Sequence, residues 1–448
     1  MTSANPPMPK VLFICSAILC GAALVAHAQQ TAPSTANDFA LRLSGNVTAQ
    51  GIPEVYMWGA GMPRDGVEGA GFPILKNAQH SAIFQEAVAA GGYNHHSQLA
   101  CYKGVFYAAW SNHPKGEDAA GQRILFATSS DGVTWRPWTE AFPPPDKVGA
   151  WDDGFGYYSV AGPWRIYENE IYLTARLYKF VGWEDASGKD LVYKRDSVHY
   201  FKRFESVGLL ARKMTGGTLG PVFALSTRMN RISDLAYPFL PYGDPAWQAA
   251  ANAIGQTFEI QREPIPTAVD GARMVEPTVY QTSANIKIAI VRDDKFSHRK
   301  YVSFSKDDGR TWSTALPTNI PDSPSLDISL KAPGGAILLI GNHCASRFDD
   351  GAKRRHYGRD TLDVAISTDG YLFAKTFAIR TGAHQWRVPR EEVPGRGGGP
   401  QYPSALIEKD RLYVMYSLGK EDIWCTSIPL ADILPAPSNP SIQPTSLP

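Results

Sequence analysis

The sequence predicts an all-β protein, a seven-bladed β-propeller, with six blades as the alternative. Three observations favour this fold class: short β-rich runs lie between polar turns, a turn motif recurs along the chain, and aromatic residues make up 11% of the sequence. A chain of 448 residues could form two or three ordinary domains, but a propeller uses such a length in one closed ring of sheets. We therefore expect a single propeller domain over residues 29–434.

The first 28 residues predict a signal peptide. Lys10 precedes an apolar run at 11–26, and Ala26 and Ala28 place small residues where a signal peptidase needs them. Cleavage before Gln29 would give a secreted or periplasmic protein that is not held in a membrane. At the other end, residues 435–448 are rich in Pro and Ser, a composition that predicts a disordered tail.

Strands are expected where β-branched and aromatic residues lie between turn residues. The clearest runs are 104–110, 170–176, 286–292 and 411–416. A helical pattern is limited to a short stretch at 249–254. The rest of the chain therefore predicts sheet and turn.

The recurring turn motif sets the expected blade length. Its full form, Ser-x-Asp-x-Gly-x-Thr-Trp, occupies 305–312, a version one residue shorter occupies 129–135, and a degenerate copy lies at 367–373. Asp307 and Asp369 are about 62 residues apart, and Asp131 precedes Asp307 by about 176 residues, close to three such units. Dividing roughly 400 mature residues by about 58 gives about seven blades.

These turns resemble the Asp-box of sialidase-type β-propellers. The resemblance implies that each turn closes an outer hairpin, while residues of the inner strands face a central funnel where ligands bind. The aspartates of the turns are then turn formers and not catalytic acids.

A polar hairpin precedes the first of these turns. It contains His95, His96 and His113, together with Asn94 and the run at 121–123. Imidazole is the side chain best suited to acid–base chemistry near neutral pH. Because neighbouring strand residues point to opposite faces, we expect only one of His95 and His96 to face the funnel and the other to be structural.

Several segments resemble secreted propellers that act on rhamnose–glucuronate linkages, a group that includes propeller-type ulvan lyases and rhamnosyl-glucuronate lyases and rhamnosidases. These segments are 94–96, 112–113, 121–123, 401–404 and 416–423. The resemblance implies a histidine-based site in a seven-bladed propeller. The matching catalytic candidates are His95 or His96, His113, Tyr158 (with Tyr157 as its substitute) and Arg176.

The resemblance therefore predicts a polysaccharide lyase that cleaves such a linkage in an acidic polysaccharide by β-elimination. The reaction needs a base for the C5 proton, an acid for the leaving O4 and a neutraliser for the carboxylate. Substrate contacts are expected from Asn94, Gln122, Arg123, Arg273 and Glu276. Hairpin salt bridging by Arg123, or a structural ion pair at Arg273 and Glu276, is the alternative.

Two other classes of function remain open. One is a glycoside hydrolase, either an α-L-rhamnosidase or a sialidase-like enzyme; a sialidase would need three arginines, a tyrosine–glutamate nucleophile pair and an aspartic acid, and the early Arg64 lies in Met-Pro-Arg-Asp instead of the usual Arg-Ile-Pro. The other class is a non-catalytic glycan-binding propeller.

The charge of the chain and its possible metal-ligating residues indicate which partners to expect. The net charge is +1, charged residues make up 19% of the chain, and no long run of one sign suggests a nucleic-acid surface. We expect an acidic polysaccharide or oligosaccharide as substrate and no required cofactor. A structural metal ion could be bound at His343-Cys344 near Arg347, although no spaced pair of ligands accompanies them.

Overall fold

The computed structural model describes residues 43–48, 51–64, 66–86, 90–146, 156–184, 191–192, 201–215, 218–260, 266–294, 297–344, 358–382, 384–388 and 398–434. By its contacts the chain divides into Met1–Leu43 and Ser44–Pro448, and all strand residues except Leu43 belong to the second part. The predicted signal peptide and the predicted tail lie outside the described residues. Within the described ranges, no helix has both the length and the apolar character needed to cross a membrane.

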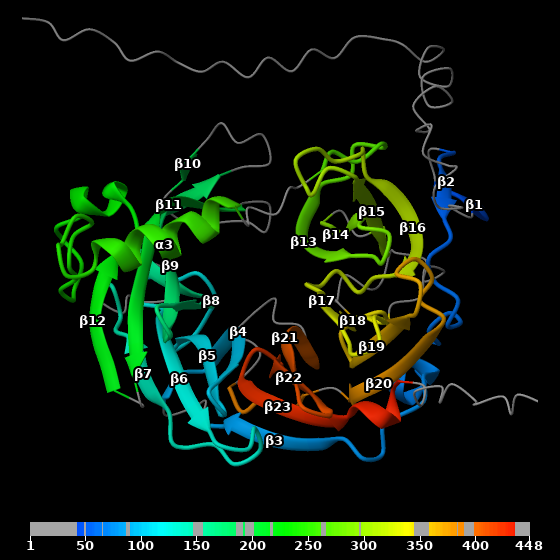
Figure 1. Ribbon diagram of the computed structural model, residues 1–448, viewed down its shortest axis with the longest axis horizontal. Coiled ribbons are helices and arrows are strands. Elements are labelled where there is room, and N and C mark those ends of the chain that lie inside the picture. The colour runs from blue at the N-terminus through cyan, green and yellow to red at the C-terminus, as the bar shows by residue number, and fades with distance from the viewer. Residues whose placement is uncertain are drawn as a thin grey trace, which may run out of the picture. The chain divides into compact units, whose positions relative to one another are not determined.

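Five sheets make up the described part of the fold (Figure 1). The first contains β4 (Tyr93–Tyr102), β5 (Val105–His113), β6 (Arg123–Ser129) and β7 (Thr139–Phe142). The second contains β8 (Gly156–Tyr167), β9 (Glu170–Glu184), β11 (Phe201–Thr215) and β12 (Thr218–Ala224), with the short β10 (Leu191–Val192) paired to β9.

The third sheet contains β13 (Met274–Gln281), β14 (Lys287–Asp293), β15 (Arg299–Ser305) and β16 (Leu316–Pro321), and it is extended by β2 (Pro53–Val55) and β1 (Leu43–Val47). The fourth contains β17 (Ile328–Lys331), β18 (Ile337–Gly341), β19 (Thr361–Ser367) and β20 (Lys375–Thr381). The fifth contains β21 (Pro400–Glu408), β22 (Arg411–Leu418), β23 (Asp422–Pro429) and β3 (Gln79–Phe84).

The fifth sheet joins a strand from the N-terminal part of the described chain to the last three strands. Strand β3 pairs with β23 in antiparallel register, with Cys425 opposite Ser81, and Figure 1 shows the blue strand beside the red one. A strand at a sheet edge exposes unpaired backbone groups, and this pairing covers one such edge. The outer strand of the last sheet therefore comes from the N-terminal part of the described chain, as in many propellers.

The prediction of an all-β fold is confirmed, but the predicted count of seven blades is not. The described residues form five sheets, and their first strands contact one another in the order β8, β4, β21, β17, β13. Between β12 and β13 the chain forms the 3-10 helix η2 (Thr227–Arg231) and helix α3 (Gln248–Ile260). Counting blades by motif spacing assigns this segment to sheet, whereas its described residues are helical, so the described residues do not confirm seven blades.

The three predicted turns share one hydrogen-bonding pattern. In each, an aspartate Oδ1 accepts a serine hydroxyl two residues earlier, at 2.8 Å for Asp131 and 2.9 Å for Asp307 and Asp369. The same serine oxygen accepts the N–H of the motif glycine at 2.8 to 2.9 Å. All three turns join the third and fourth strands of a sheet.

The first strands of the sheets are irregular. Register shifts interrupt β4, β8, β13 and β21 where they pair with the next strand. His96, Glu276 and Tyr402 lie at three of these bulges with φ of 56°, 51° and 54°. A bulge adds a residue to one strand and turns its side chain out of the normal alternation. Non-glycine residues in this left-handed region carry strain that often accompanies functional sites.

Candidate active site

The three bulge residues belong to one cluster of acids, bases and cations. The Tyr402 hydroxyl donates a hydrogen bond to Glu276 Oε1 at 2.6 Å. From β14, Arg292 Nη1 donates to the Tyr402 oxygen at 3.0 Å and to Glu276 Oε2 at 2.7 Å. Strands from two different sheets thus place a phenol, a carboxylate and a guanidinium in mutual contact.

The protonation state of this trio follows from its surroundings. The Arg292 side chain is 7% exposed and that of Glu276 is 29% exposed. Burial, and then the charge of Glu276, raise the pKa of Tyr402 well above its usual value. The resting state is therefore a neutral phenol that already points its proton at a carboxylate.

Both predicted histidines of β4 lie beside this tyrosine. The His95 ring centroid is 4.2 Å from that of Tyr402, the His96 centroid is 6.3 Å from it, and the two imidazoles are 4.9 Å apart. The expectation that the pair points to opposite faces is wrong. The bulge between His95 and Gln98 breaks the alternation on which it depended.

The two histidines differ in exposure and in partners. His95 is fully buried, and its Nδ1 lies 2.7 Å from Ser417 Oγ. The His96 side chain is 20% exposed, with Nδ1 3.2 Å from Ser111 Oγ. Burial is the main cause that lowers the pKa of His95 well below its usual value, and it also lowers the pKa of His96. Both rings are therefore neutral at pH 7.

Further charges surround the tyrosine ring. Lys420 Nζ lies 6.0 Å from the Tyr402 ring centroid and donates to Glu117 Oε2 at 2.5 Å, and the Arg359 guanidinium lies 5.4 Å from the same centroid. Glu117 Oε1 is 3.8 Å from His96 Nε2. Burial opposes ionisation of Glu117, but Lys420, His95 and His96 together outweigh it, and the pKa of Glu117 is well below its usual value.

Asn94, another predicted residue of the hairpin, makes hydrogen bonds only within the protein. The Asn94 amide donates to Gly91 O at 2.9 Å and Glu421 O at 2.7 Å, and its oxygen accepts hydrogen bonds from Trp110 and Asn112. All of its hydrogen-bonding capacity is used inside the protein. The predicted substrate contact by Asn94 has no support from this geometry.

Gln122 and Arg123 are also bound to their neighbours. Gln122 is fully buried, with its amide 2.8 Å from Ser159 O. Arg123 donates to Glu140 at 2.9 Å and to Asn112 at 2.8 Å. These contacts favour the structural alternative over substrate binding.

His113 organises a loop instead of joining the cluster. Its Nδ1 accepts the backbone N–H of Lys115 at 3.2 Å and of Gly116 at 3.1 Å, and its Nε2 lies 3.2 Å from Ala120 O. The ring is 1% exposed. The His113 ring therefore holds the loop that carries Glu117, and the catalytic role of His113 stays a prediction.

Tyr158, Arg176 and Arg273 make their direct contacts with other side chains, although burial, and then the charges of Asp118 and Glu117, raise the pKa of Tyr158. Tyr158 is buried and stacks on Tyr178 with 5.4 Å between centroids. Arg176 is exposed on β9. Burial is the main cause that lowers the pKa of Arg165, and the charge of Arg176 lowers it further. The Arg273 side chain is 67% exposed and lies 3.4 Å from Asp294. None of their recorded partners is a histidine of β4, so their catalytic and binding roles stay predictions.

The predicted metal position at His343 is filled by carboxylates. His343 Nδ1 lies 2.7 Å from Asp363 and Nε2 lies 3.2 Å from Asp327, and all three side chains are buried. The Cys344 thiol donates to Gly358 O at 2.7 Å. Arg347 lies outside the described residues. Both imidazole nitrogens are engaged, which leaves His343 without a ligand atom for a metal.

The free energy of unfolding should fall as the pH rises, because the His343 imidazolium in this buried cluster loses its proton. Burial alone would lower the pKa of His343, but Asp363 and Asp327 raise it from 6.5 to about 10. The stabilisation is complete below pH 6.5 and is lost as the pH rises toward 10. Urea titrations between pH 6.5 and 8.5 should show a declining free energy of unfolding, and His343→Gln should flatten the decline. An equal slope in both proteins would contradict this assignment.

Tyr402, Arg292, Glu117, Arg359 and Lys420 are not among the predicted site residues. One local signal marks the first of them. Proline follows the bulge residue in Glu276-Pro277 and Tyr402-Pro403, and proline inside a strand indicates a bulge or an edge. The remaining residues come from strands and loops far apart in sequence, and no local pattern brings them together.

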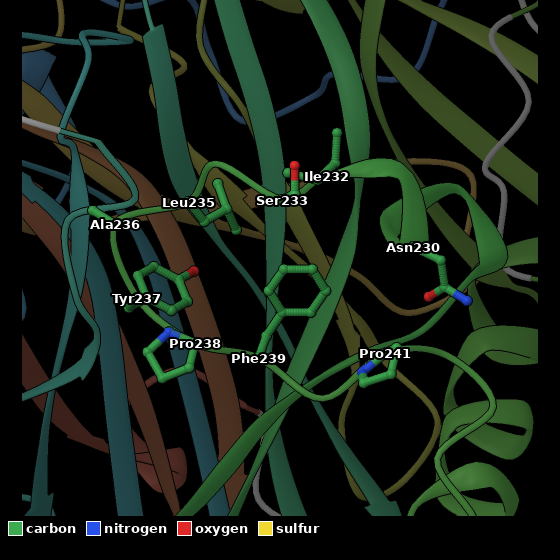
Figure 2. Close-up of a pocket in the computed structure, with 9 residues that line it drawn as sticks. All are labelled: Asn230, Ile232, Ser233, Leu235, Ala236, Tyr237, Pro238, Phe239 and Pro241. Carbon is green, nitrogen blue, oxygen red and sulfur yellow. The ribbon is translucent and has the colours of Figure 1, made fainter.

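A separate pocket lies in the segment between η2 and α3. It has a volume of about 510 Å³ and is lined by residues between Asn230 and Pro241, with the rings of Tyr237 and Phe239 shown in Figure 2. Its lining contains no carboxylate, histidine or cation. It therefore lacks the groups for acid–base chemistry, unlike the cluster around Tyr402.

Comparisons with known proteins agree with a β-propeller protein. Residues 247–414 match a family described as a BNR repeat-like domain, and residues 74–153 match one described as an N-terminal beta propeller. No curated protein matches the chain.

Among solved structures, the chain is similar to a sialidase with 18% identity and a TM-score of 0.56, over 84% of this chain and 35% of that one. It is also similar to a protein of unknown function from Dyadobacter fermentans, with 14% identity, a TM-score of 0.48 and coverage of 79% and 99%. A third is an intramolecular trans-sialidase from Ruminococcus gnavus, with 12% identity, a TM-score of 0.47 and coverage of 80% and 99%. The chain spans about a third of the length of the first sialidase. At these identities the similarity to the first sialidase shows the fold.

Proposed function

We propose that the protein is a glycan-processing enzyme that hydrolyses a glycosidic bond of an acidic sugar, with Tyr402 as the nucleophile. The observation that carries the proposal is the Tyr402 hydroxyl held between Glu276 Oε1, 2.6 Å away, and Arg292 Nη1, 3.0 Å away. Most glycosidases use a pair of carboxylates, whereas sialidases use a tyrosine as the nucleophile. The similarity to a sialidase structure is consistent with this reading.

The first step would form a glycosyl–tyrosine intermediate. As the Tyr402 oxygen bonds to the anomeric carbon, its proton moves to Glu276 and the bond to the leaving oxygen breaks. Arg292 stabilises the phenolate character that develops on the oxygen. His96, the more exposed imidazole, would bring a proton from solvent to the leaving oxygen, with Glu117 stabilising the imidazolium.

The second step would reverse these proton transfers. His96, neutral after the first step, would accept a proton from a water that attacks the anomeric carbon and then release that proton to solvent. Glu276 would return its proton to Tyr402 as the carbon–oxygen bond to the tyrosine breaks. The sugar then leaves with its anomeric configuration retained.

An acidic substrate fits the cations around the tyrosine ring. Arg292, Arg359 and Lys420 all lie within 6.0 Å of the Tyr402 ring or bond its hydroxyl. Guanidinium groups match carboxylate geometry, so a uronate or another carboxylated sugar is the substrate class we propose.

β-Elimination at a rhamnose–glucuronate linkage is the second candidate. It is favoured by the short distances between His95, His96 and Tyr402. These side chains offer a base and an acid close enough to act on the same sugar residue. With cleavage of residues 1–28, either enzyme would act in the periplasm or outside the cell. We propose residues 29–434 as its single propeller domain.

One assay separates the candidates. The protein is incubated with ulvan, with rhamnose-capped glucuronate oligosaccharides and with sialylated oligosaccharides, and ultraviolet absorbance and released sugars are recorded. Hydrolysis releases sugar without new absorbance, whereas β-elimination leaves a double bond conjugated to the carboxylate, which absorbs. Binding without release would identify a glycan-binding propeller and reject both enzymes.

Glu276→Gln should reduce turnover by about 10² to 10⁴-fold, because the amide cannot accept the phenol proton. Asp294→Asn is the matched control. Asp294 Oδ1 lies 3.1 Å from Nη2 of the same Arg292, and its side chain is 28% exposed. Unlike Glu276, it is not the acceptor of the Tyr402 hydroxyl. It should keep turnover close to that of the parent protein. Similar losses in both variants would show that Glu276 only positions Arg292.

A further inference from the structure

We propose that His95, His96 and Glu117 form a binding site for a divalent transition-metal ion such as Zn²⁺. One ligand atom from each of these residues lies within 4.8 Å of the others. Two imidazoles and a carboxylate are a ligand set of catalytic zinc sites. A metal held by His96 would occupy the imidazole nitrogen that carries the proton in the hydrolase proposal, so the two roles of His96 exclude each other. Metal binding is measured without substrate and is therefore tested separately from the hydrolase assignment.

The second observation is an unused ligand atom. His95 is fully buried, and its Nε2 has no hydrogen-bond partner among the described residues. A buried polar atom without a partner is costly, and metal ligation is one way to satisfy it. Of the three ligand residues, His95 therefore offers the most nearly preformed position.

The tautomer of His95 is suited to ligation. The Ser417 hydroxyl donates to Gln401 O at 3.4 Å, so its oxygen is available to accept the Nδ1 proton of His95 at 2.7 Å. The lone pair then resides on Nε2, where a metal would bind. Metal-ligating histidines commonly donate their other ring N–H in this way.

Only small movements are needed to close the site. Zinc–ligand distances near 2.1 Å place tetrahedral ligand atoms about 3.4 Å apart, compared with 3.8 Å between His96 Nε2 and Glu117 Oε1. The side chains of His96 and Glu117 are 20% and 36% exposed and can adjust. Three protein ligands leave a position for water or a substrate oxygen, beside the Tyr402 ring.

Lys420 would compete with the metal. Its ammonium lies 2.5 Å from Glu117 Oε2 and occupies one of the two carboxylate oxygens. Lys420→Met should therefore tighten metal binding, because it frees that oxygen and removes a nearby positive charge. We expect a gain of about tenfold, since a like charge a few ångströms away repels the ion even at a hydrated site.

The test is a calorimetric titration of the full chain with Zn²⁺ alone, after removal of bound metal by a chelator. We expect one equivalent to bind, and His96→Gln and Glu117→Gln each to weaken binding by about 100-fold or more. The control is His80→Gln on β3, whose ring bonds Thr426 at 2.8 Å, and it should bind zinc as the parent does. Thermal melts identify variants that are folded.

Three results would overturn the site. They are no zinc binding by the folded parent, parent-like affinity in the His96→Gln and Glu117→Gln double variant, and loss of binding in His384→Gln. The last result would place the ion at the His384, Glu421 and Asp422 cluster. Cobalt substitution gives an independent readout, because a tetrahedral Co²⁺ site with histidine ligands absorbs visible light and should lose that band in His96→Gln.

Discussion

Tyr402→Phe should reduce turnover of the glycan substrate by about 10⁴-fold or more, because the variant has no nucleophilic oxygen. Arg292 and Glu276 keep their contact at 2.7 Å, so the cluster should remain folded. Turnover and thermal melting are measured on the same preparation. A Tyr402→Phe protein with more than a tenth of the parent turnover would contradict a nucleophilic role.

Tyr416→Phe is the control for the loss of a buried hydroxyl. Tyr416 is fully buried on β22 and its hydroxyl lies 2.9 Å from Thr426, outside the cluster. It should cost about 1 kcal/mol of stability and leave turnover unchanged. A fluorinated, carboxylated sugar that traps the intermediate should label Tyr402 in the parent protein. A lyase would leave the tyrosine unlabelled.

Asp363→Asn should lower the free energy of unfolding by about 3 to 5 kcal/mol, because it removes one partner of a buried ion pair. Asp363 and His343 are both fully buried, and the Asp363 carboxylate accepts the ring N–H and the backbone N–H of His343 at 2.7 and 2.9 Å. The measurement is urea denaturation at pH 6.5.

The matched control is Asp308→Asn, which breaks an exposed ion pair. Asp308 lies 2.8 Å from Lys287, with its side chain 79% exposed. Water and salt screen exposed pairs, which contribute little to stability, so this variant should unfold close to the parent. Equal effects of the two substitutions would show that the carboxylate of Asp363 is not held as a buried charge.

Local patterns predicted much of the fold. The β-rich runs became β5, β9, β14 and β22, the helical pattern at 249–254 became part of α3, and the motif at 305–312 closes a hairpin. These features depend on residues close together in sequence. The number of sheets depends on the whole segment between β12 and β13, whose helical content a turn spacing cannot show.

The candidate site was predicted only in part. His95, His96 and Glu276 were identified, but Tyr402 is 126 residues from Glu276 and meets it only through tertiary structure. The expectation that His95 and His96 point to opposite faces is wrong because a bulge interrupts the strand there. Without a proline, the sequence pattern does not indicate a bulge. His96 is followed by Ser97, whereas Glu276 and Tyr402 precede prolines.

The pairing of β3 with β23 determines when the protein can finish folding. His80 and Thr426, which meet across these strands, are 346 residues apart in the chain. A ribosome releases β3 long before it makes β23, so β3 waits without its partner while the intervening sheets are synthesised. Its unpaired edge is then open to association with other chains.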